Sequence, residues 1–321
     1  MSESSIREAP RHPDRDTPPL AAAPAAPNGA RRHKVTTVTL RDLKARGMPA
    51  ACVTAYDYPT AVFAGRAGVD VLLVGDSAAM TVLGLPNTLG IGMAEMLVFA
   101  RAVARGARRA FVIGDLPFLS YQVSDEDAIR NAGAFVAAGC DAVKCEGGRR
   151  VAPRVRAIAD AGIAVMGHIG LTPQALGQQG GYRVQGRTPA EAARLLDDAR
   201  ALEDAGAFAI LIEATPPHAA AHVRRHVQVP VYGIGAGPHV DGQLVISHDL
   251  LGIFVGDVKP RFVSRLAQLD AAVTTAFAEY ADQVRTAAFP APEHWYAPAP
   301  EPGTPSRATQ VPGRRRAPAP A

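Results

Sequence analysis

Residues 138–168, AGCDAVKCEGGRRVAPRVRAIADAGIAVMGH, contain the pattern that decides the fold of this 321-residue chain. Two short apolar runs, CDAVKCE (140–146) and IAVMGH (163–168), flank a longer segment with a helical pattern. An Ala-Gly pair stands just before each run, and glycine there permits the left-handed conformation that ends a helix. The stretch therefore predicts a strand, a helix and a second strand parallel to the first.

The same alternation continues through most of the chain. Ala-Gly pairs recur at residues 67–68 and 205–206, and a polar residue follows each of the four pairs after about seven residues. Eight apolar runs fit the strand pattern: PAACVTA (49–55), VDVLLVG (69–75), AFVIGD (110–115), CDAVKCE (140–146), IAVMGH (163–168), AFAILIE (207–213), VPVYGI (229–234) and GIFV (252–255). Such runs suit parallel strands buried on both faces, and eight of them over about 250 residues predict a (β/α)8 TIM barrel. An open doubly wound sheet is the alternative, but no GxGxxG motif follows the first run.

The two ends of the chain lack apolar periodicity. Residues 1–34 are rich in Pro, Ala, Arg and Asp, and residues 297–321 repeat Pro and Ala around three consecutive arginines. Segments of this composition bury too little apolar surface to offset the entropy of ordering. We therefore expect disordered tails on both sides of a catalytic barrel domain that spans residues 35–296.

The formal net charge of +4 belongs to the ends of the chain. Residues 1–34 and 286–321 each carry a net charge of +2, so the residues between them are neutral. A neutral core is weak evidence for a nucleic-acid surface, and we expect no nucleic-acid partner.

The cysteines and the hydropathy indicate the compartment. Cys52, Cys140 and Cys145 form no CxxC pair and lie in apolar runs, where cysteine is usually a small buried residue. We therefore expect a reducing environment. No apolar run approaches the roughly 20 residues of a membrane span, and no hydrophobic segment precedes the alanine-rich stretch near the N-terminus. These features predict a cytoplasmic protein with no membrane partner.

Acidic side chains follow three successive predicted strands. Asp76, Asp115 and Glu146 stand at strand ends, and the carboxyl ends of all strands in a barrel meet at one mouth. Grouped carboxylates repel one another unless a cation lies between them, and hard oxygen ligands suit Mg²⁺. We therefore predict one magnesium ion bound by these three residues. The alternative is that each acid caps a helix or pairs with a surface arginine.

Three further polar residues are predicted at the same mouth. Glu213 leaves an apolar strand, and partial desolvation would raise its pKa and suit a general base. Lys144 faces the same side as Glu146, because strand side chains repeat with period two, and would neutralise a substrate carboxylate or form a Schiff base. His168 would donate a hydrogen bond to a developing enolate oxygen or simply fix a loop. The residues alone leave these alternatives open.

Two glycine-containing loops have open roles. GIGAGPHVDG (233–242) is similar to phosphate-binding loops of barrels but contains no Lys or Arg, so tight backbone packing is an equal alternative. GGYRVQGR (180–187) has the composition of a mobile loop, and it would serve as a lid, a subunit contact or a cofactor contact.

The chain resembles the ketopantoate hydroxymethyltransferase family over residues 35–296. The resemblance rests on these stretches in order: TAYDYPTA (54–61), LLVGDSAAMTVLG (72–84), GDLPF (114–118), VKCEGG (143–148), GHIGLTPQ (167–174), GGYRVQGR (180–187), LIEATP (211–216), GIGAG (233–237), DGQ (241–243) and HDLLG (248–252). Each stretch alone is weak evidence. All of them in order at predicted strand ends are strong evidence.

Membership of this family would imply a barrel of the phosphoenolpyruvate/pyruvate type and a homodecamer. It would also imply transfer of a hydroxymethyl group from 5,10-methylenetetrahydrofolate to 3-methyl-2-oxobutanoate, giving 2-dehydropantoate in pantothenate biosynthesis. Glu213 would accept the proton from substrate carbon 3. The residues implied at the substrate are Asp76, Ser77, Asp115, Lys144 and His168, and the implied ligands of Mg²⁺ are Asp76, Asp115 and Glu146.

The chain departs from the family pattern at two places. Val98-Phe99-Ala100 stands where many members have Tyr-His-Thr, and Arg183 replaces the more usual Lys in the loop 180–187. The first departure falls on a helix after the second strand and puts a peripheral contact in doubt.

A metal-dependent carbon–carbon lyase of the isocitrate lyase/phosphoenolpyruvate mutase type is the alternative function. Such enzymes usually carry a KxxCG-type loop, and none is visible in this chain. A barrel kept only as a binding scaffold is a third possibility, and it would predict loss of the acids, all of which are present.

Overall fold

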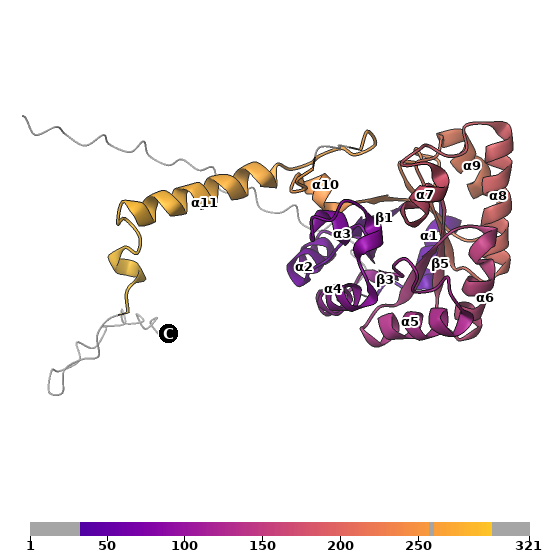
Figure 1. Ribbon diagram of the computed structural model, residues 1–321, viewed down its shortest axis with the longest axis horizontal. Helices are drawn as coiled ribbons and strands as arrows, with labels where there is room; N and C mark the ends of the chain where they lie inside the picture. Colours follow the sequence, from indigo (N-terminus) through magenta and orange to yellow (C-terminus); the bar gives the residue numbers. More distant parts are fainter. Residues whose placement is uncertain (1–32, 257–259, 297–321) are drawn as a thin grey trace, which may run out of the picture. The chain divides into compact units, whose positions relative to one another are not determined.

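The computed structural model describes residues 33–256 and 260–296. Eight parallel strands close into a barrel in chain order (Figure 1). They are β1 (Ala50–Thr54), β2 (Val71–Val74), β3 (Phe111–Asp115), β4 (Ala142–Glu146), β5 (Val165–Gly170), β6 (Ala209–Glu213), β7 (Val231–Ile234) and β8 (Gly242–Val245). The closed barrel confirms the predicted (β/α)8 fold and excludes the open doubly wound sheet. The tails expected at the two ends fall on residues 1–32 and 297–321, which lie outside the described residues.

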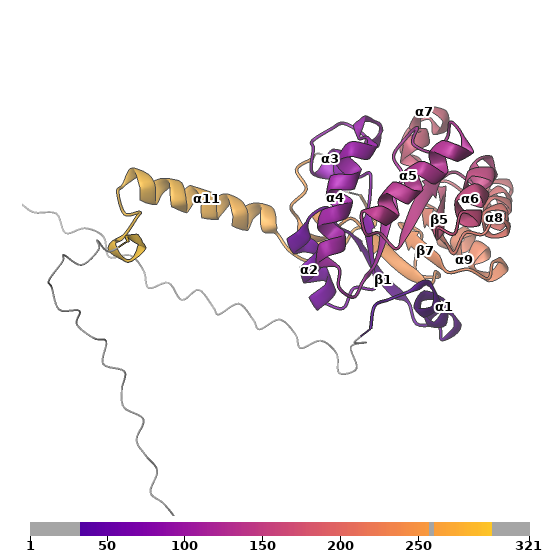
Figure 2. The same cartoon turned by 90° about the horizontal axis from the view of Figure 1, so that it is seen from below.

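Helices surround the barrel, and Figure 2 shows α1 and α7 at its opposite ends. The helices of this part are α1 (Thr37–Ala45), α2 (Tyr58–Arg66), α3 (Ala78–Thr81), α4 (Met93–Gly106), α5 (Asp125–Ala137), α6 (Ala152–Asp160), α7 (Leu176–Gln179), α8 (Pro189–Asp204), α9 (Pro217–His226) and α10 (Ser247–Leu251). Short 3₁₀ turns are η1 (Thr88–Gly90), η2 (Arg149–Val151) and η3 (Pro173–Ala175). Because η1, η2, η3, α3 and α7 all follow strands, they build the mouth at the carboxyl end of the barrel.

The chain divides into two compact units between Gln268 and Leu269. The second unit contains α11 (Leu269–Arg285) and η4 (Pro292–His294). Inside it the rings of Tyr280 and Phe289 pack edge to face with centroids 5.4 Å apart. The domain limits expected from the sequence, residues 35–296, stay a prediction. Among the described helices, none has both the length and the apolar content required to cross a bilayer.

The helix ends follow the local sequence signals. Gly68, Gly139, Gly162 and Gly206 all have positive φ angles between 83° and 101°, which confirms the predicted helix-ending role of the Ala-Gly pairs. At the start of α8 the Thr188 hydroxyl accepts a hydrogen bond from a backbone N–H three residues later, and that residue's carboxylate accepts one from Thr188 N–H. These local signals give each strand a defined starting point.

The core has two layers, which explains the continuous apolar runs. Alternate strand residues such as Leu73, Ile113 and Leu211 fill the inside of the barrel. Their neighbours, such as Leu72 and Ile210, pack outward against the helices. Since both faces of β2, β3, β4 and β5 are buried, most positions of both sets are apolar. The three cysteines are buried and free, as expected.

The eighth strand differs from the sequence prediction. β8 is GQLV (242–245), which pairs with β1 and β7, whereas the predicted run GIFV (252–255) follows α10. A Cβ on Gly242 would lie 2.6 Å from the Ala50 carbonyl oxygen, so glycine is needed where β8 pairs with β1. Gln243 is exposed, and this short polar strand therefore lacks an apolar run. Val255 is 89% exposed and cannot belong to a buried strand.

Candidate active site

Five charged or titratable side chains are buried together at the carboxyl end of the barrel. They come from the β2–α3 loop and from β3, β4 and β5, and each is at most 5% exposed: Asp76, Asp115, Lys144, Glu146 and His168. The strand register places Lys144 beside Asp115 and His168 beside Glu146. The structure thus brings together residues that lie up to 92 positions apart in the chain. Buried charge of this density is costly, and it is typical of a functional site.

Lys144 lies at the centre of this cluster. Its Nζ is 2.8 Å from Asp115 Oδ1, 3.1 Å from Glu146 Oε1 and 3.3 Å from His168 Nδ1. Burial disfavours the charged amine, but the attraction of Asp115, Glu146 and Asp76 outweighs it and raises the pKa of Lys144. The amine is therefore an ammonium group, which binds anions but does not attack a carbonyl. The geometry favours the role of carboxylate binding over a Schiff base.

Glu146 is held ionised by its neighbours. Burial alone would raise its pKa, but Lys144 and then His168 lower the pKa of Glu146 to about 2. Its Oε2 accepts a hydrogen bond of 2.9 Å from the backbone N–H of Gln174, and its Oε1 faces Lys144 and His168. Both oxygens therefore have partners.

Asp76 and Asp115 are less well compensated. Burial, followed by the charges of Asp115 and Glu146, raises the pKa of Asp76 well above its usual range. Burial also raises the pKa of Asp115, although Lys144 opposes this. The backbone N–H of Asp76 donates to Asp115 Oδ2 at 3.0 Å, so the two residues are adjacent. Among the residues that the structure describes, Asp115 Oδ1 has the ion-pair contact with Lys144 at 2.8 Å and accepts no hydrogen bond. A cation placed here would lower the electrostatic cost of both carboxylates.

The carboxylates of Asp76 and Asp115 are chemically suitable ligands for Mg²⁺. Mg²⁺ is commonly bound by one or two carboxylates, with waters and substrate oxygens completing its octahedron. Asp76 and Asp115 supply such a pair of hard oxygens. Across residues 33–256 and 260–296, no group of three or more His, Cys, Asp or Glu side chains is placed so that it could hold a metal ion. The assignment of Asp76, Asp115 and Glu146 as metal ligands stays a prediction. In the structure, Lys144 and His168 contact Glu146 Oε1.

His168 connects the acidic cluster to Glu213 on β6. His168 Nε2 is 3.3 Å from Glu213 Oε2, and His168 Nδ1 is 3.3 Å from Glu146 Oε1. Burial and the charge of Lys144 lower the pKa of His168, but the effects of Glu146 and Glu213 are larger, so the pKa lies above its ordinary value. The Glu213 side chain is 16% exposed, which leaves it accessible from the barrel mouth.

Ser77 lies next to Asp76 and is oriented by Tyr56. The Tyr56 and Ser77 hydroxyl oxygens are 2.8 Å apart. The ring of Tyr56 packs against His248 at 5.2 Å and edge to face against Phe99 at 6.5 Å. Phe99, one of the residues at which the chain departs from the family pattern, therefore contacts Tyr56, which in turn contacts Ser77. This departure lies closer to the site than we expected from the sequence.

Two residues of the site were not singled out from the sequence. The Gln174 side chain donates to Asp76 Oδ2 at 2.9 Å, and the Tyr121 hydroxyl binds the backbone of Glu146. Gln174 falls in the stretch GHIGLTPQ, but a polar residue in a loop has no periodic signal that marks it. Tyr121 is fully buried, and from the sequence it cannot be distinguished from an aromatic residue of the core.

The two glycine-containing loops have different surroundings. Cβ atoms on Gly235 and Gly237 would lie 2.6 Å from Phe262 and Pro217, which supports tight packing as the role of residues 233–242. In the loop 180–187, the Tyr182 hydroxyl contacts Met80 Sδ at 3.6 Å. Burial, followed by the charges of Asp76, Glu213 and Glu146, raises the pKa of Tyr182.

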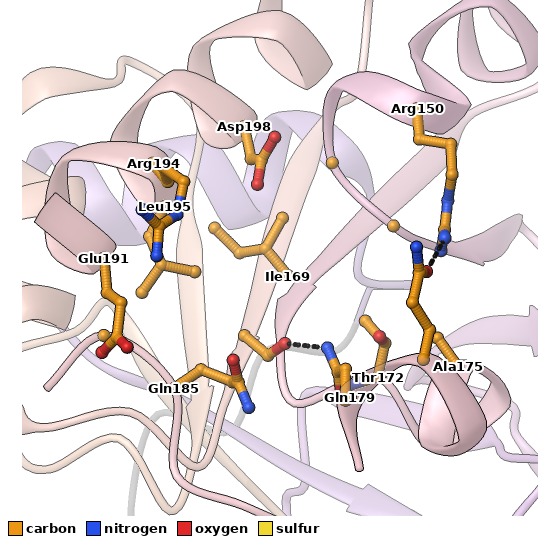
Figure 3. A pocket seen from close by; sticks show the side chains of 15 residues that line it. Arg150, Ile169, Thr172, Ala175, Gln179, Gln185, Glu191, Arg194, Leu195 and Asp198 are labelled. Carbon is orange, nitrogen blue, oxygen red and sulfur yellow. Dashed lines mark hydrogen bonds between the residues drawn. The ribbon is translucent and has the colours of Figure 1, made fainter.

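A cavity of about 370 Å³ lies behind the loop 180–187, between β5 and α8 (Figure 3). Ile169 and Leu195 line its apolar part, and Arg150 and Arg194 lie at its sides. Gln179 donates to the Gly170 carbonyl oxygen at 3.0 Å and so fixes one wall. None of the buried acids of the barrel mouth lines this cavity, so it is separate from the cluster.

Comparisons with known protein sequences point to one family. A sequence profile of the ketopantoate hydroxymethyltransferase family matches residues 34–292. The chain is 53% identical over 243 residues to a 3-methyl-2-oxobutanoate hydroxymethyltransferase of Syntrophobacter fumaroxidans, covering 75% of this chain and 86% of that one. A protein of the same name from Moorella thermoacetica is 49% identical over 266 residues, covering 83% and 98% of the two chains.

Similarity to solved structures is confined to the fold. Phosphonopyruvate hydrolase in complex with oxalate and Mg²⁺ aligns with a TM-score of 0.55 and 17% identity, covering 80% of this chain and 93% of that one. At this identity the likeness shows only a common barrel. The sequence matches, in contrast, cover nearly the whole barrel at about half identity, and they confirm the resemblance that the motifs indicated. The chain belongs to the ketopantoate hydroxymethyltransferase family.

Proposed function

We propose that this chain transfers a one-carbon unit from 5,10-methylenetetrahydrofolate to 3-methyl-2-oxobutanoate and releases 2-dehydropantoate and tetrahydrofolate. In this reaction the C3–H bond of the keto acid and the two bonds from the folate nitrogens to the methylene carbon break, and that carbon forms new bonds to C3 and to an oxygen. The C3 proton and one proton of water end on the two folate nitrogens. Water supplies the hydroxyl group of the product. Family membership over residues 34–292, with the matching acids buried at one barrel mouth, is the observation that carries the proposal.

Glu213 is the proposed proton acceptor. It stands at the end of β6, is partly exposed to the mouth, and has His168 Nε2 as its neighbour at 3.3 Å. A carboxylate that is fixed on one side and open on the other can reach the C3 proton of a bound keto acid. His168 Nε2 makes no hydrogen bond within the described residues, so it can donate to the keto oxygen of a substrate bound beside Glu213.

Lys144, Ser77 and His168 are the proposed anchors of the keto acid. The Lys144 ammonium group supplies the positive charge for the substrate carboxylate, and the Ser77 hydroxyl, held by Tyr56, supplies a hydrogen bond. Their positions on three separate elements fix the substrate in one orientation relative to Glu213. Such fixed donors stabilise negative charge that develops on the keto oxygen.

Asp76 and Asp115 are the proposed ligands of one Mg²⁺ per subunit, with Glu146 beside them. The adjacency of the two aspartates and their raised pKa values support this assignment. When bound, the ion would polarise the keto carbonyl of the substrate. The likeness to a Mg²⁺-containing barrel supports only the fold.

Further features are proposed from family membership alone. The chain acts on small molecules, a keto acid and a folate, and we place it in the cytoplasm as a homodecamer. The lyase alternative has no support beyond the shared barrel, because similarity to that group lies below 25% identity.

The test is product formation by the purified full chain. With Mg²⁺, 3-methyl-2-oxobutanoate and 5,10-methylenetetrahydrofolate, we expect 2-dehydropantoate, detected by mass spectrometry, and no product after chelation with EDTA. Tetrahydrofolate should appear in equal amount. Absence of product with both substrates and Mg²⁺ present, from protein with the circular dichroism of a folded barrel, would overturn the proposal.

A further inference from the structure

Gln174, in η3 after β5, makes an unusual set of contacts for a loop residue. It is 6% exposed. Its Nε2 donates to Asp76 Oδ2 and to the Leu116 carbonyl oxygen, both at 2.9 Å. Its Oε1 accepts from the Tyr121 hydroxyl at 2.8 Å and from Gln122 Nε2 at 3.3 Å. Every hydrogen-bonding position of the side-chain amide is therefore filled.

These partners allow only one orientation of the amide. Nε2 faces a carboxylate and a carbonyl oxygen, which accept hydrogen bonds, whereas Oε1 faces a hydroxyl and an amide group, which donate them. A flipped amide would place its oxygen against two acceptors. Tyr121 is itself fixed, because its hydroxyl also accepts a hydrogen bond of 3.0 Å from the backbone N–H of Glu146.

The backbone of Gln174 reaches a second acid of the cluster. Its N–H donates to Glu146 Oε2 at 2.9 Å. One residue therefore engages one oxygen of Asp76 and one oxygen of Glu146, across 98 and 28 positions of the chain. Gln174 does not contact the other oxygen of Asp76, Oδ1, whereas the other oxygen of Glu146, Oε1, faces Lys144 and His168.

We propose that Gln174 is a positioning residue, which fixes the rotamer of Asp76 so that the carboxylate presents one defined oxygen to a divalent cation. The inference rests on the proposed role of Asp76 as a metal ligand. Partners that orient a ligating carboxylate typically contribute about 10- to 100-fold to metal affinity. The side chain and the backbone act separately, since a substitution removes the Asp76 contact but leaves the N–H that binds Glu146.

The test compares Gln174→Met with Gln179→Met. Methionine keeps the length of the side chain and removes the amide. Gln179 is the matched control, because it lies five residues later, at the end of α7 (Figure 3). Its side chain accepts from the N–H of Thr172 at 3.1 Å and donates to the carbonyl oxygen of Gly170 at 3.0 Å, which are both backbone groups. Mn²⁺ is the probe, and its affinity for each full-length variant is measured by electron paramagnetic resonance without substrate.

We expect Gln174→Met to weaken Mn²⁺ binding by about 10- to 100-fold and Gln179→Met to change it less than twofold. Gln174→Glu should weaken binding of the keto acid more than Gln174→Met does, because the new carboxylate would face Asp76. This effect should appear as a raised KM for the keto acid. If Gln174→Met fails to fold, as judged by circular dichroism, Tyr121→Phe is the second variant. It removes the hydroxyl that orients the Gln174 amide, and it should also lower the affinity for Mn²⁺.

Mn²⁺ affinity of Gln174→Met within twofold of the wild type would overturn the inference, as would equal losses in Gln174→Met and Gln179→Met. These outcomes are distinguishable from failure of the proposed function. If the wild type forms 2-dehydropantoate while Gln174→Met binds Mn²⁺ normally, only the positioning role is wrong. If Mn²⁺ binding depends on Gln174 while no 2-dehydropantoate forms, only the proposed reaction is wrong.

Discussion

Replacing Lys144 by methionine should lower the free energy of unfolding by about 3 kcal/mol near pH 7 when divalent ions are chelated. Lys144 is 2% exposed and is the ammonium group that contacts both Asp115 and Glu146. Methionine fills similar space, so the change removes the charge more than the packing. Two buried carboxylates would then lack their cation.

The magnitude follows from Glu146. Burial opposes its ionisation, yet Lys144 and then His168 lower its pKa from 4.5 to about 2. A tenfold change in proton affinity corresponds to about 1.4 kcal/mol, so this lowering corresponds to about 3 kcal/mol of stability, which Lys144 and His168 share. Loss of the Lys144 contact with Asp115 adds to the Lys144 share. That contribution is complete above pH 4.5 and is lost as the pH falls towards 2. In the variant, the pKa of the unpaired carboxyls is raised, and stability should increase as the pH falls below 7.

The assay is urea unfolding followed by circular dichroism at several pH values in EDTA. Asp76 and Asp115 have raised pKa values in the wild type as well, so the quantity compared is the difference between the two proteins at each pH. This difference should be largest near pH 7 and should shrink on acidification. Lys34→Met is the control, because Lys34 pairs with Asp141 in a partly exposed position and should cost less than about 1 kcal/mol. A difference below 1 kcal/mol at pH 7, or one that does not depend on pH, would refute the reasoning.

Three further predictions concern the mouth and the opposite end of the barrel. Glu213→Gln should slow the exchange of the C3 proton of 3-methyl-2-oxobutanoate in D₂O by about 100- to 10,000-fold with little change in substrate affinity, and exchange at the wild-type rate by NMR would exclude Glu213 as the base. Asp76→Ala and Asp115→Ala should each weaken Mn²⁺ binding and abolish turnover, and a variant that binds Mn²⁺ with wild-type affinity in paramagnetic resonance would remove that residue from the ligand set. Asp241→Ala should lower the free energy of unfolding by about 3 kcal/mol in urea titrations, because Asp241 is a buried partner of Lys44 and Arg224. Turnover per folded molecule should persist in Asp241→Ala, and its loss would contradict a site confined to the carboxyl ends of the strands.

The barrel could be predicted largely from local patterns. Seven of the eight apolar runs overlap the observed strands, and the glycines that end the helices have the expected positive φ angles. The prediction of the eighth strand was wrong. β8 is short, contains the exposed Gln243, and requires glycine at position 242, which lies against Ala50. A four-residue strand with only two adjacent apolar residues carries no periodic signal, whereas its pairing with β1 and β7 is visible only in three dimensions.

The acids of the mouth were also predictable, because strand ends converge in any barrel, but their individual partners were not. The sequence alone determined the fold class, the family and the side chains at the strand ends, since each depends on residue types at local spacings. The tertiary structure decided that Lys144 lies between Asp115 and Glu146, and that Gln174 reaches across the mouth to Asp76. Contacts of this kind depend on the paths of several loops at once, and they join residues that no local pattern relates.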